Sequence, residues 1–138
     1  IMAVANGLAD LAIANSYYYG YMLSGKAGDA QRDAAKKVKM FFPNQTNRGM
    51  HINISGLGVL KSSKNVDNAN KFIEFLLSNQ MQSSMVNNSF EYPILKNVLP
   101  HPDIASSGVD FIEDDMLVSE FGKFNAEAIK LMDRAGWK

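Results

Sequence analysis

The sequence predicts an α/β fold with a largely parallel sheet. Short apolar or alternating runs, typical of strands, are interleaved with longer segments whose apolar residues recur at helical spacing. One run, Leu11–Ala14, is apolar without a break, as expected of a strand that is buried on both faces of a parallel sheet. Polar turns that contain glycine or proline separate these segments. The chain has 138 residues, which is enough for one domain with its own core.

Strands and helices alternate from the start of the chain. The predicted elements before Pro43 are a helix end over residues 1–5, a strand over 11–14, helices over about 17–23 and 29–37, and a strand over 38–42. Gly7 tolerates the positive φ that ends the first helix, and Asn15 or Ser16 can cap the second. Gly25 and Gly28 interrupt the helical pattern. Pro43 lacks an N–H group, so it stops the last of these strands.

Two longer helices are predicted in the rest of the chain. The predicted elements are a polar loop over 44–49, a strand over 51–55, a bend over 56–58 with extended residues 59–60, a helix from Asn65 with an apolar pattern that extends to Met81 and Met85, an extended segment over 90–93, a connection over 99–108, and a last helix that ends at Gly136. The strand over 51–55 is predicted by strict alternation. Each helix is predicted by one apolar stripe, comprising Ala69, Phe72, Ile73, Leu76 and Leu77 in the first and Leu117, Phe121, Phe124, Ala128, Leu131 and Met132 in the second.

Composition excludes several classes of function. The 14 basic and 14 acidic residues balance, so the basic excess of a nucleic-acid-binding protein is missing. The absence of cysteine removes thiolate metal sites and thiol catalysis. No apolar run approaches the roughly 20 residues of a membrane-spanning helix, so we expect no membrane insertion of this segment. Ser55 and Ser62 have no recognisable base partner, so we expect no enzyme of the nucleophilic kind.

Three consecutive tyrosines, Tyr17, Tyr18 and Tyr19, are the most informative feature of the sequence. They follow the predicted strand over 11–14, and ligands of open α/β folds bind beyond the carboxyl ends of strands. Phenolate oxygen is a hard anionic ligand that suits a hard, highly charged cation such as Fe³⁺. Adjacent side chains diverge on a regular helix, but Tyr17 and Tyr18 can converge at the junction where the helix begins.

A second interpretation of the tyrosines is that they are core or interface aromatics whose hydroxyls are hydrogen-bonded. On residue chemistry alone this interpretation is the commoner one. The two histidines offer little else: His51 is expected to pack within its strand and His101, between prolines, to be exposed. The acidic residues 113–115 lack the spacing of a calcium loop and predict a solvated turn before the last helix.

The run Ala14–Gly20 resembles the Asn-x-Tyr-Tyr signature of bacterial ferric-iron-binding proteins, the periplasmic receptors of iron ABC importers. The resemblance continues in order through most of the chain, over residues 42–45, 48–59, 68–78 and 90–93. It implies an α/β chain that is part of a two-lobed type II periplasmic-binding-protein (Venus-flytrap) fold. It also implies a function in iron transport: a substrate-binding protein that holds ferric iron in the cleft between the lobes.

The resemblance also assigns residues. Tyr17 and Tyr18 fall on the two metal-ligand tyrosines, and Asn15 falls where the family contacts the exogenous anion that completes the iron shell. Tyr19 then either contacts the ligand tyrosines from outside the metal shell or packs in the core. The implied cargo is Fe³⁺ with a synergistic anion, carbonate or similar. The family's other ligands come from upstream sequence, so we expect this chain to be the carboxyl-terminal portion of a longer protein.

The resemblance further implies lobes, partners and location. Residues 1–55 and 108–138 would belong to the carboxyl-terminal lobe and residues 56–107 to the amino-terminal lobe. The closed protein would dock on an ABC importer permease in the periplasm. The full-length protein is expected to be a monomer, whereas this chain alone can self-associate. The alternative function is a binding protein of the same fold for another small solute, such as an organic anion or sugar phosphate. An enzyme with a tyrosine acid or base would need a second catalytic group, and none is seen.

Overall fold

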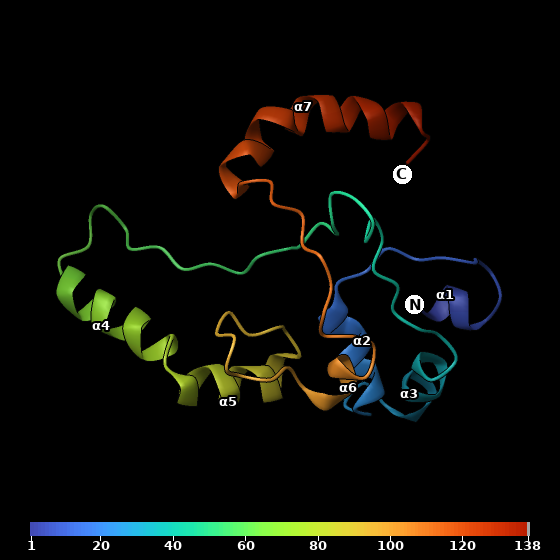
Figure 1. The fold of residues 1–138 in the computed structure, drawn as a ribbon, viewed down its shortest axis with the longest axis horizontal. Helices are drawn as coiled ribbons and strands as arrows, with labels where there is room; N and C mark the ends of the chain where they lie inside the picture. The colour runs from blue at the N-terminus through green and yellow to red at the C-terminus, as the bar shows by residue number, and fades with distance from the viewer. Residues whose placement is uncertain (138) are drawn as a thin grey trace. The chain divides into compact units, whose positions relative to one another are not determined.

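The computed structural model describes residues 1–137 (Figure 1). The helices in this part of the chain are α1 (Met2–Ala5), α2 (Ser16–Leu23), α3 (Asp29–Ala35), α4 (Val66–Leu76), α5 (Asn79–Ser89), α6 (Pro102–Ala105) and α7 (Val118–Arg134). The chain divides into two compact units. The first comprises residues 1–42 and 53–110 and contains α1 to α6; the second comprises residues 43–52 and the chain from Phe111 onward and contains α7. The predicted assignment of 56–107 to a separate lobe stays a prediction.

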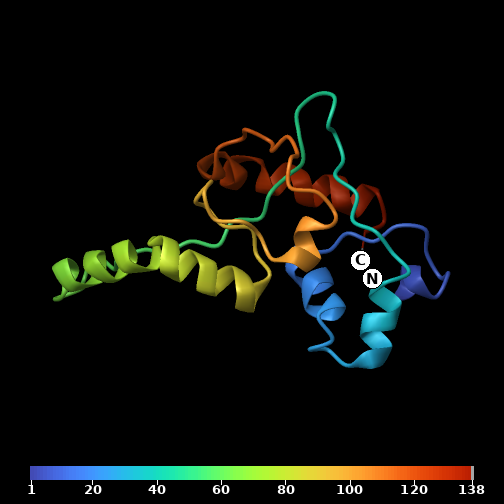
Figure 2. The same ribbon diagram turned by 60° about the horizontal axis from the view of Figure 1, so that its bottom comes forward.

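The core of the first unit lies around α2. This helix packs against α3 and α6, and α1 packs against α3; Figures 1 and 2 both show α6 beside α2. The buried residues that form the core are Tyr19, Met22, Ala34, Ala35, Phe90 and Ile104. Burial of these side chains, at roughly 25 cal/mol per Å² of apolar area, is what holds the short helices in place.

The predicted helices α2 and α3 are confirmed, although α2 begins at Ser16 and α3 ends at Ala35 rather than at Lys37. Asn15 is the N-cap residue of α2 with extended backbone angles (φ −70°, ψ 141°), although its side chain makes no capping hydrogen bond. Gly25 and Gly28 adopt φ values of 81° and 99° between the two helices. Only glycine takes these values without strain, so the two glycines end α2 and allow α3 to begin in a new direction.

The apolar pattern predicted to extend from Asn65 to Met85 belongs to two helices rather than one. After α4, Leu77 still has helical angles, but Ser78 is extended and its Oγ accepts a hydrogen bond from the Met81 N–H at 3.3 Å. A serine N-cap of this kind satisfies a donor at the start of a new helix, so α5 begins one residue later. The helix α5 ends at Phe90, which is left-handed (φ 60°) instead of extended as predicted.

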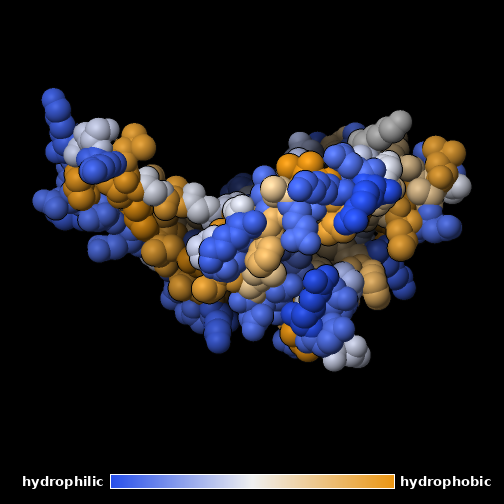
Figure 3. Space-filling view, turned by 90° about the horizontal axis from the view of Figure 1, so that it is seen from above, coloured by the Kyte–Doolittle hydropathy of each residue, from blue (hydrophilic) through white to orange (hydrophobic). Residues whose placement is uncertain are grey.

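Much apolar surface on these helices is exposed. The stripe that predicted α4 includes Phe72, and that residue and Phe75 are at least half exposed. Figure 3 shows a band of apolar surface along the region of α4 and α5. In α7 the stripe residues Phe124 and Leu131 are similarly exposed. The helical spacing therefore predicted the helices correctly, while part of each apolar face is exposed in residues 1–137.

The predicted strands over 11–14, 38–42, 51–55 and 59–60 do not form within residues 1–137. Leu11 and Ile13, expected to be buried on both faces of a sheet, are 81% and 86% exposed. A strand is held by backbone hydrogen bonds to a neighbouring strand, and these four segments do not pair with one another here. The apolar pattern shows that these residues favour a strand. A strand forms only where a second segment pairs with it, and the pattern does not determine that pairing.

Sheet-like pairing in the described residues consists of one isolated parallel bridge, between Met50 and Glu113. The Met50 N–H donates to the Ile112 carbonyl at 2.8 Å, and the Asp114 N–H donates to the Met50 carbonyl at 2.9 Å. The Gln45 side chain supports this bridge, because its amide donates to the Ile112 carbonyl and accepts from the Ile112 N–H. The predicted solvated turn over 113–115 is therefore partly a backbone pairing.

The histidines fall in different surroundings. The prediction that His101 is exposed is wrong: its ring lies 4.6 Å from that of Phe90, and its Nδ1 accepts the Asp103 N–H at 3.2 Å. It thereby caps α6, a short helix inside the segment predicted to be only a connection. His51 packs as expected, with its ring 5.3 Å from that of Phe121. Within residues 1–137, no helix combines the length and the apolar character needed to cross a membrane.

Candidate metal site

Tyr17 and Tyr18 lie together in the first turn of α2. Their ring centroids are 4.4 Å apart and the ring planes are inclined by 51°. Consecutive side chains on a helix point about 100° apart, so this proximity depends on their place in the first turn, where no preceding turn restricts them. Tyr17 is partly buried and Tyr18 is 54% exposed. The rings therefore converge, as predicted, and remain open to solvent; their role as metal ligands stays a prediction.

Asn15 hydrogen-bonds to the tyrosine pair rather than to the helix backbone. Its Nδ2 donates to the Tyr17 Oη at 3.1 Å. Its Oδ1 accepts a hydrogen bond from the Asn53 Nδ2, also at 3.1 Å. A donor aimed at a phenol oxygen stabilises the phenolate form. The contact predicted between Asn15 and an exogenous anion remains a prediction, while its contact with Tyr17 is part of the structure.

The protonation of Tyr17 reflects these neighbours. A hydrogen bond with the Tyr18 hydroxyl raises the pKa of Tyr17, with further increases from desolvation and from the charges of Tyr18 and Glu91; the Asn15 amide lowers it. The net pKa of Tyr17 is raised above its ordinary value of 10.0. Without a cation, Tyr17 is therefore a neutral phenol at neutral pH, and a metal ion would have to displace its proton.

A carboxylate, that of Glu91, lies near the tyrosines, and no sequence motif predicted it. Glu91 follows α5 and accepts a hydrogen bond from the Ser55 Oγ at 2.7 Å. Ser55 and Asn53 are two residues apart in an extended segment, so they lie on the same side of it. The alternation over 51–55 predicted that shared side, but no pattern in the sequence indicated that it faces α2 and Glu91.

Tyr19 faces away from the other two tyrosines, into the core. It is 9% exposed, and its hydroxyl donates to the Val38 carbonyl at 3.2 Å. Of the two roles predicted for Tyr19, packing is the one that these contacts support. The alternative interpretation of the tyrosines, as core aromatics with hydrogen-bonded hydroxyls, therefore describes Tyr19.

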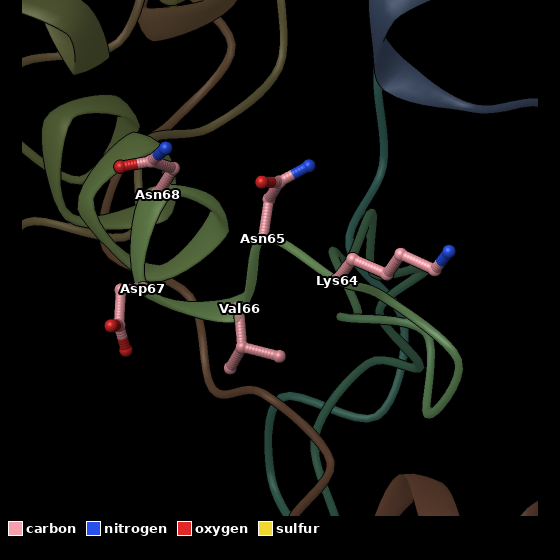
Figure 4. Close-up of a pocket in the computed structure, with 5 residues that line it drawn as sticks. All are labelled: Lys64, Asn65, Val66, Asp67 and Asn68. Atoms are coloured by element: carbon pink, nitrogen blue, oxygen red, sulfur yellow. The ribbon is translucent and has the colours of Figure 1, made fainter.

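Histidine and carboxylate side chains offer no second metal site in residues 1–137. These residues contain no cluster of three or more histidine or carboxylate side chains that could hold a metal. A surface hollow at the start of α4 is lined by Lys64, Asn65, Val66, Asp67 and Asn68. Figure 4 shows Asn65 and Asn68 on one side of the backbone and Val66 and Asp67 on the other, so these side chains do not converge on a common point.

Comparison with known proteins defines the family to which this chain belongs. Residues 4–109 match the family described as bacterial extracellular solute-binding protein, and the chain belongs to that family. Iron uptake protein A1 of Synechocystis sp. is 44% identical over 138 residues, which cover all of this chain and 38% of that protein. The chain thus spans about two fifths of the length of the curated relatives that it matches.

Solved structures agree with the family assignment. The Trichodesmium protein FutA (IdiA), in complex with iron and citrate, superposes with a TM-score of 0.89 at 45% identity, over 99% of this chain and 43% of that one. A ferric binding protein from Campylobacter jejuni superposes with a TM-score of 0.84 at 38% identity, over 99% and 42% of the two chains. The predicted fold class is confirmed: the chain is part of the α/β, two-lobed type II solute-binding fold.

Proposed function

We propose that the whole protein containing this chain is a receptor that binds ferric ion and delivers it to an ABC importer. The observation that carries this proposal is the convergence of Tyr17 and Tyr18 at the start of α2. Their ring centroids are 4.4 Å apart, and both side chains are at least partly exposed to solvent. Supporting it, the relatives and structural neighbours of the chain are named as iron uptake or ferric-binding proteins.

Tyr17 and Tyr18 would hold iron as phenolates. Fe³⁺ is a hard cation, and its charge stabilises the anionic form of a phenol whose pKa would otherwise keep it neutral. The hydrogen bond from Asn15 to the Tyr17 oxygen favours the same form. Two phenolates do not fill the shell of a ferric ion, so the remaining positions would be taken by other protein ligands and by an anion.

Asn15 would contact that anion as well. Its amide nitrogen carries two hydrogens, of which one is directed to Tyr17. The second hydrogen and the start of α2, where the helix dipole favours negative charge, suit an anion such as carbonate. The Trichodesmium protein was solved with iron and citrate, so a carboxylate anion is the other candidate for this position.

Delivery would use the hinge motion of a two-lobed protein. Contacts made to iron only in the closed state would shift the population toward that state. In this proposal residues 1–55 and 108–138 belong to one lobe and 56–107 to the other. The closed form would dock on a permease in the periplasm, and the protein would carry out binding and transport rather than catalysis.

Titration of the whole protein separates ferric ion from other solutes. Ferric citrate, citrate alone, organic anions and sugar phosphates would be added in turn, with binding followed by calorimetry. The proposal predicts tight binding for ferric citrate only. Equal or tighter binding of an iron-free organic anion or sugar phosphate would replace it with the alternative function. A Tyr17→Phe variant should bind ferric ion more weakly, while binding of an iron-free solute, if any, is retained.

A further inference from the structure

A chain of two amide hydrogen bonds joins Asn53 to the first tyrosine. The Asn53 Nδ2 donates to the Asn15 Oδ1 at 3.1 Å, and the Asn15 Nδ2 donates to the Tyr17 Oη at 3.1 Å. Asn53 is 38 residues from Asn15 in sequence, so this contact ties the extended segment after residue 52 to the start of α2. Neither the predicted iron ligands nor the predicted anion contact includes Asn53.

The two bonds use one orientation of the Asn15 amide. An asparagine amide can present either its oxygen or its nitrogen to a neighbour, and the two orientations differ by a half-turn of the group. Asn53 donates to Asn15, which requires the Asn15 oxygen to face Asn53. The Asn15 nitrogen must then face Tyr17. With the opposite orientation, Asn15 would present an oxygen to Tyr17, and an oxygen acceptor there favours the protonated phenol.

We propose that Asn53 is a positioning residue for the ferric site, which holds the Asn15 amide so that it donates to the Tyr17 oxygen. This inference rests on the proposed function, because the Tyr17 oxygen must be a ligand for the effect to be seen in iron binding. Asn53 hydrogen-bonds to Asn15 rather than to a tyrosine. Its effect passes through Asn15 to one of the two tyrosines, Tyr17, and not to Tyr18.

The contact has a matched control in the same chain. Asn97 donates to the Asn79 Oδ1 at 3.1 Å, so it makes the same kind of exposed amide–amide bond as Asn53, but to a residue that is not part of the tyrosine site. Asn97→Ala therefore removes an equivalent hydrogen bond without disturbing Asn15. Circular dichroism of both variants would establish that the fold is retained.

Ferric affinity, measured by competition with citrate in the whole protein, tests the inference. Asn53→Ala should weaken binding about threefold to tenfold, the range for one hydrogen bond, and Asn97→Ala should leave it unchanged. The loss should persist in a Tyr18→Phe background and vanish in a Tyr17→Phe background, because coupling between two residues disappears when the group that transmits it is removed. An equal loss in all backgrounds, or no loss in the original protein, would overturn the inference.

The visible absorption band of the iron-loaded protein gives a second test. It is needed if Tyr17→Phe binds iron too weakly for its affinity to be compared with that of the other variants. A hydrogen bond to a phenolate oxygen lowers the energy of its donor electrons, so loss of the bond should move the phenolate-to-iron absorption band to longer wavelength. Asn53→Ala should show this shift and Asn97→Ala should not; an unmoved band in Asn53→Ala overturns the inference. If Tyr17→Phe and Tyr18→Phe both leave the band and affinity intact, the proposed tyrosine site fails instead.

Discussion

Gly20 lies so close to Phe90 that a Cβ added to Gly20 would stand 2.9 Å from the Phe90 Cβ. The same added atom would stand 2.7 Å from the Ile104 Cδ1. The missing side chain thus allows α2 to approach both the left-handed turn after α5 and helix α6. Because Gly20 shares α2 with the tyrosine pair, this contact sets the position of the helix that carries the candidate site.

Gly20→Ala should destabilise the chain despite the better helix propensity of alanine. Propensity favours alanine by about 1 kcal/mol, but overpacking a core costs about 1–3 kcal/mol, and the Phe90 Cβ cannot move without its backbone. We expect a net loss of up to about 2 kcal/mol in urea unfolding. Gly122→Ala is the matched control: it is also helical, its added Cβ meets nothing within 4 Å, and it should be neutral or stabilising. A Gly20→Ala variant as stable as Gly122→Ala would contradict this description of the core.

Tyr19→Phe separates packing from metal binding within the tyrosine run. The change keeps the buried ring but removes the hydrogen bond from the Tyr19 hydroxyl to the Val38 carbonyl. Leaving that carbonyl without its donor should lower the free energy of unfolding by about 1 kcal/mol. Ferric affinity, measured on the folded variant, should be unchanged. A strong loss of iron binding with unaltered stability would instead place Tyr19 in the metal shell.

Iron binding should release a proton from Tyr17. The hydrogen bond with Tyr18 raises the pKa of Tyr17, so Tyr17 is protonated at neutral pH and must lose its proton to bind the metal. Affinity should therefore fall as the pH falls, because protons compete with iron for the phenolate. In weakly buffered solution, Tyr17→Phe should release about one proton fewer per ferric ion than the original protein. Equal release from both proteins would show that Tyr17 is not a ligand.

Tyr92 gives the fold a dependence on alkaline pH. Its hydroxyl donates to the Gly108 carbonyl at 3.0 Å, and burial raises the pKa of Tyr92 to about 12. In the unfolded chain the pKa is about 10, so the unfolded state loses this proton first. The stability due to the neutral phenol is fully present below pH 10 and is lost as the pH rises toward 12. Urea midpoints between those pH values should fall less steeply in Tyr92→Phe; identical slopes would refute this assignment.

The sequence predicted the helices and the convergence of Tyr17 with Tyr18 better than it predicted the pairing of strands. Local signals determine where α2 starts and ends: Asn15 precedes it, and Gly25 and Gly28 follow it. The strand patterns, such as that of Leu11–Ala14, indicate which residues favour a strand. Whether two strands pair depends on residues that are distant in the sequence. That pairing is absent from residues 1–137, and the run is exposed as a result.

In the candidate site, too, the sequence did not predict contacts between residues that are distant along the chain. The convergence of Tyr17 with Tyr18 follows from their place at a helix start and could be predicted. The contact between Asn53 and Asn15 joins residues 38 apart, and no periodicity reports such a pairing. The division of the helix at Ser78 was missed for another reason, since the apolar spacing continued across a serine that acts as a cap.

The visible absorption spectrum of the iron-loaded whole protein tests the central claim most directly. Phenolate ligands to Fe³⁺ give a charge-transfer band, and we expect Tyr17→Phe and Tyr18→Phe each to weaken and shift it. Tyr21→Phe is the control, since Tyr21 lies on the same helix with its ring 6.3 Å from that of Phe90, and the band should be unaltered. An unchanged band and affinity in both Tyr17→Phe and Tyr18→Phe would contradict the account.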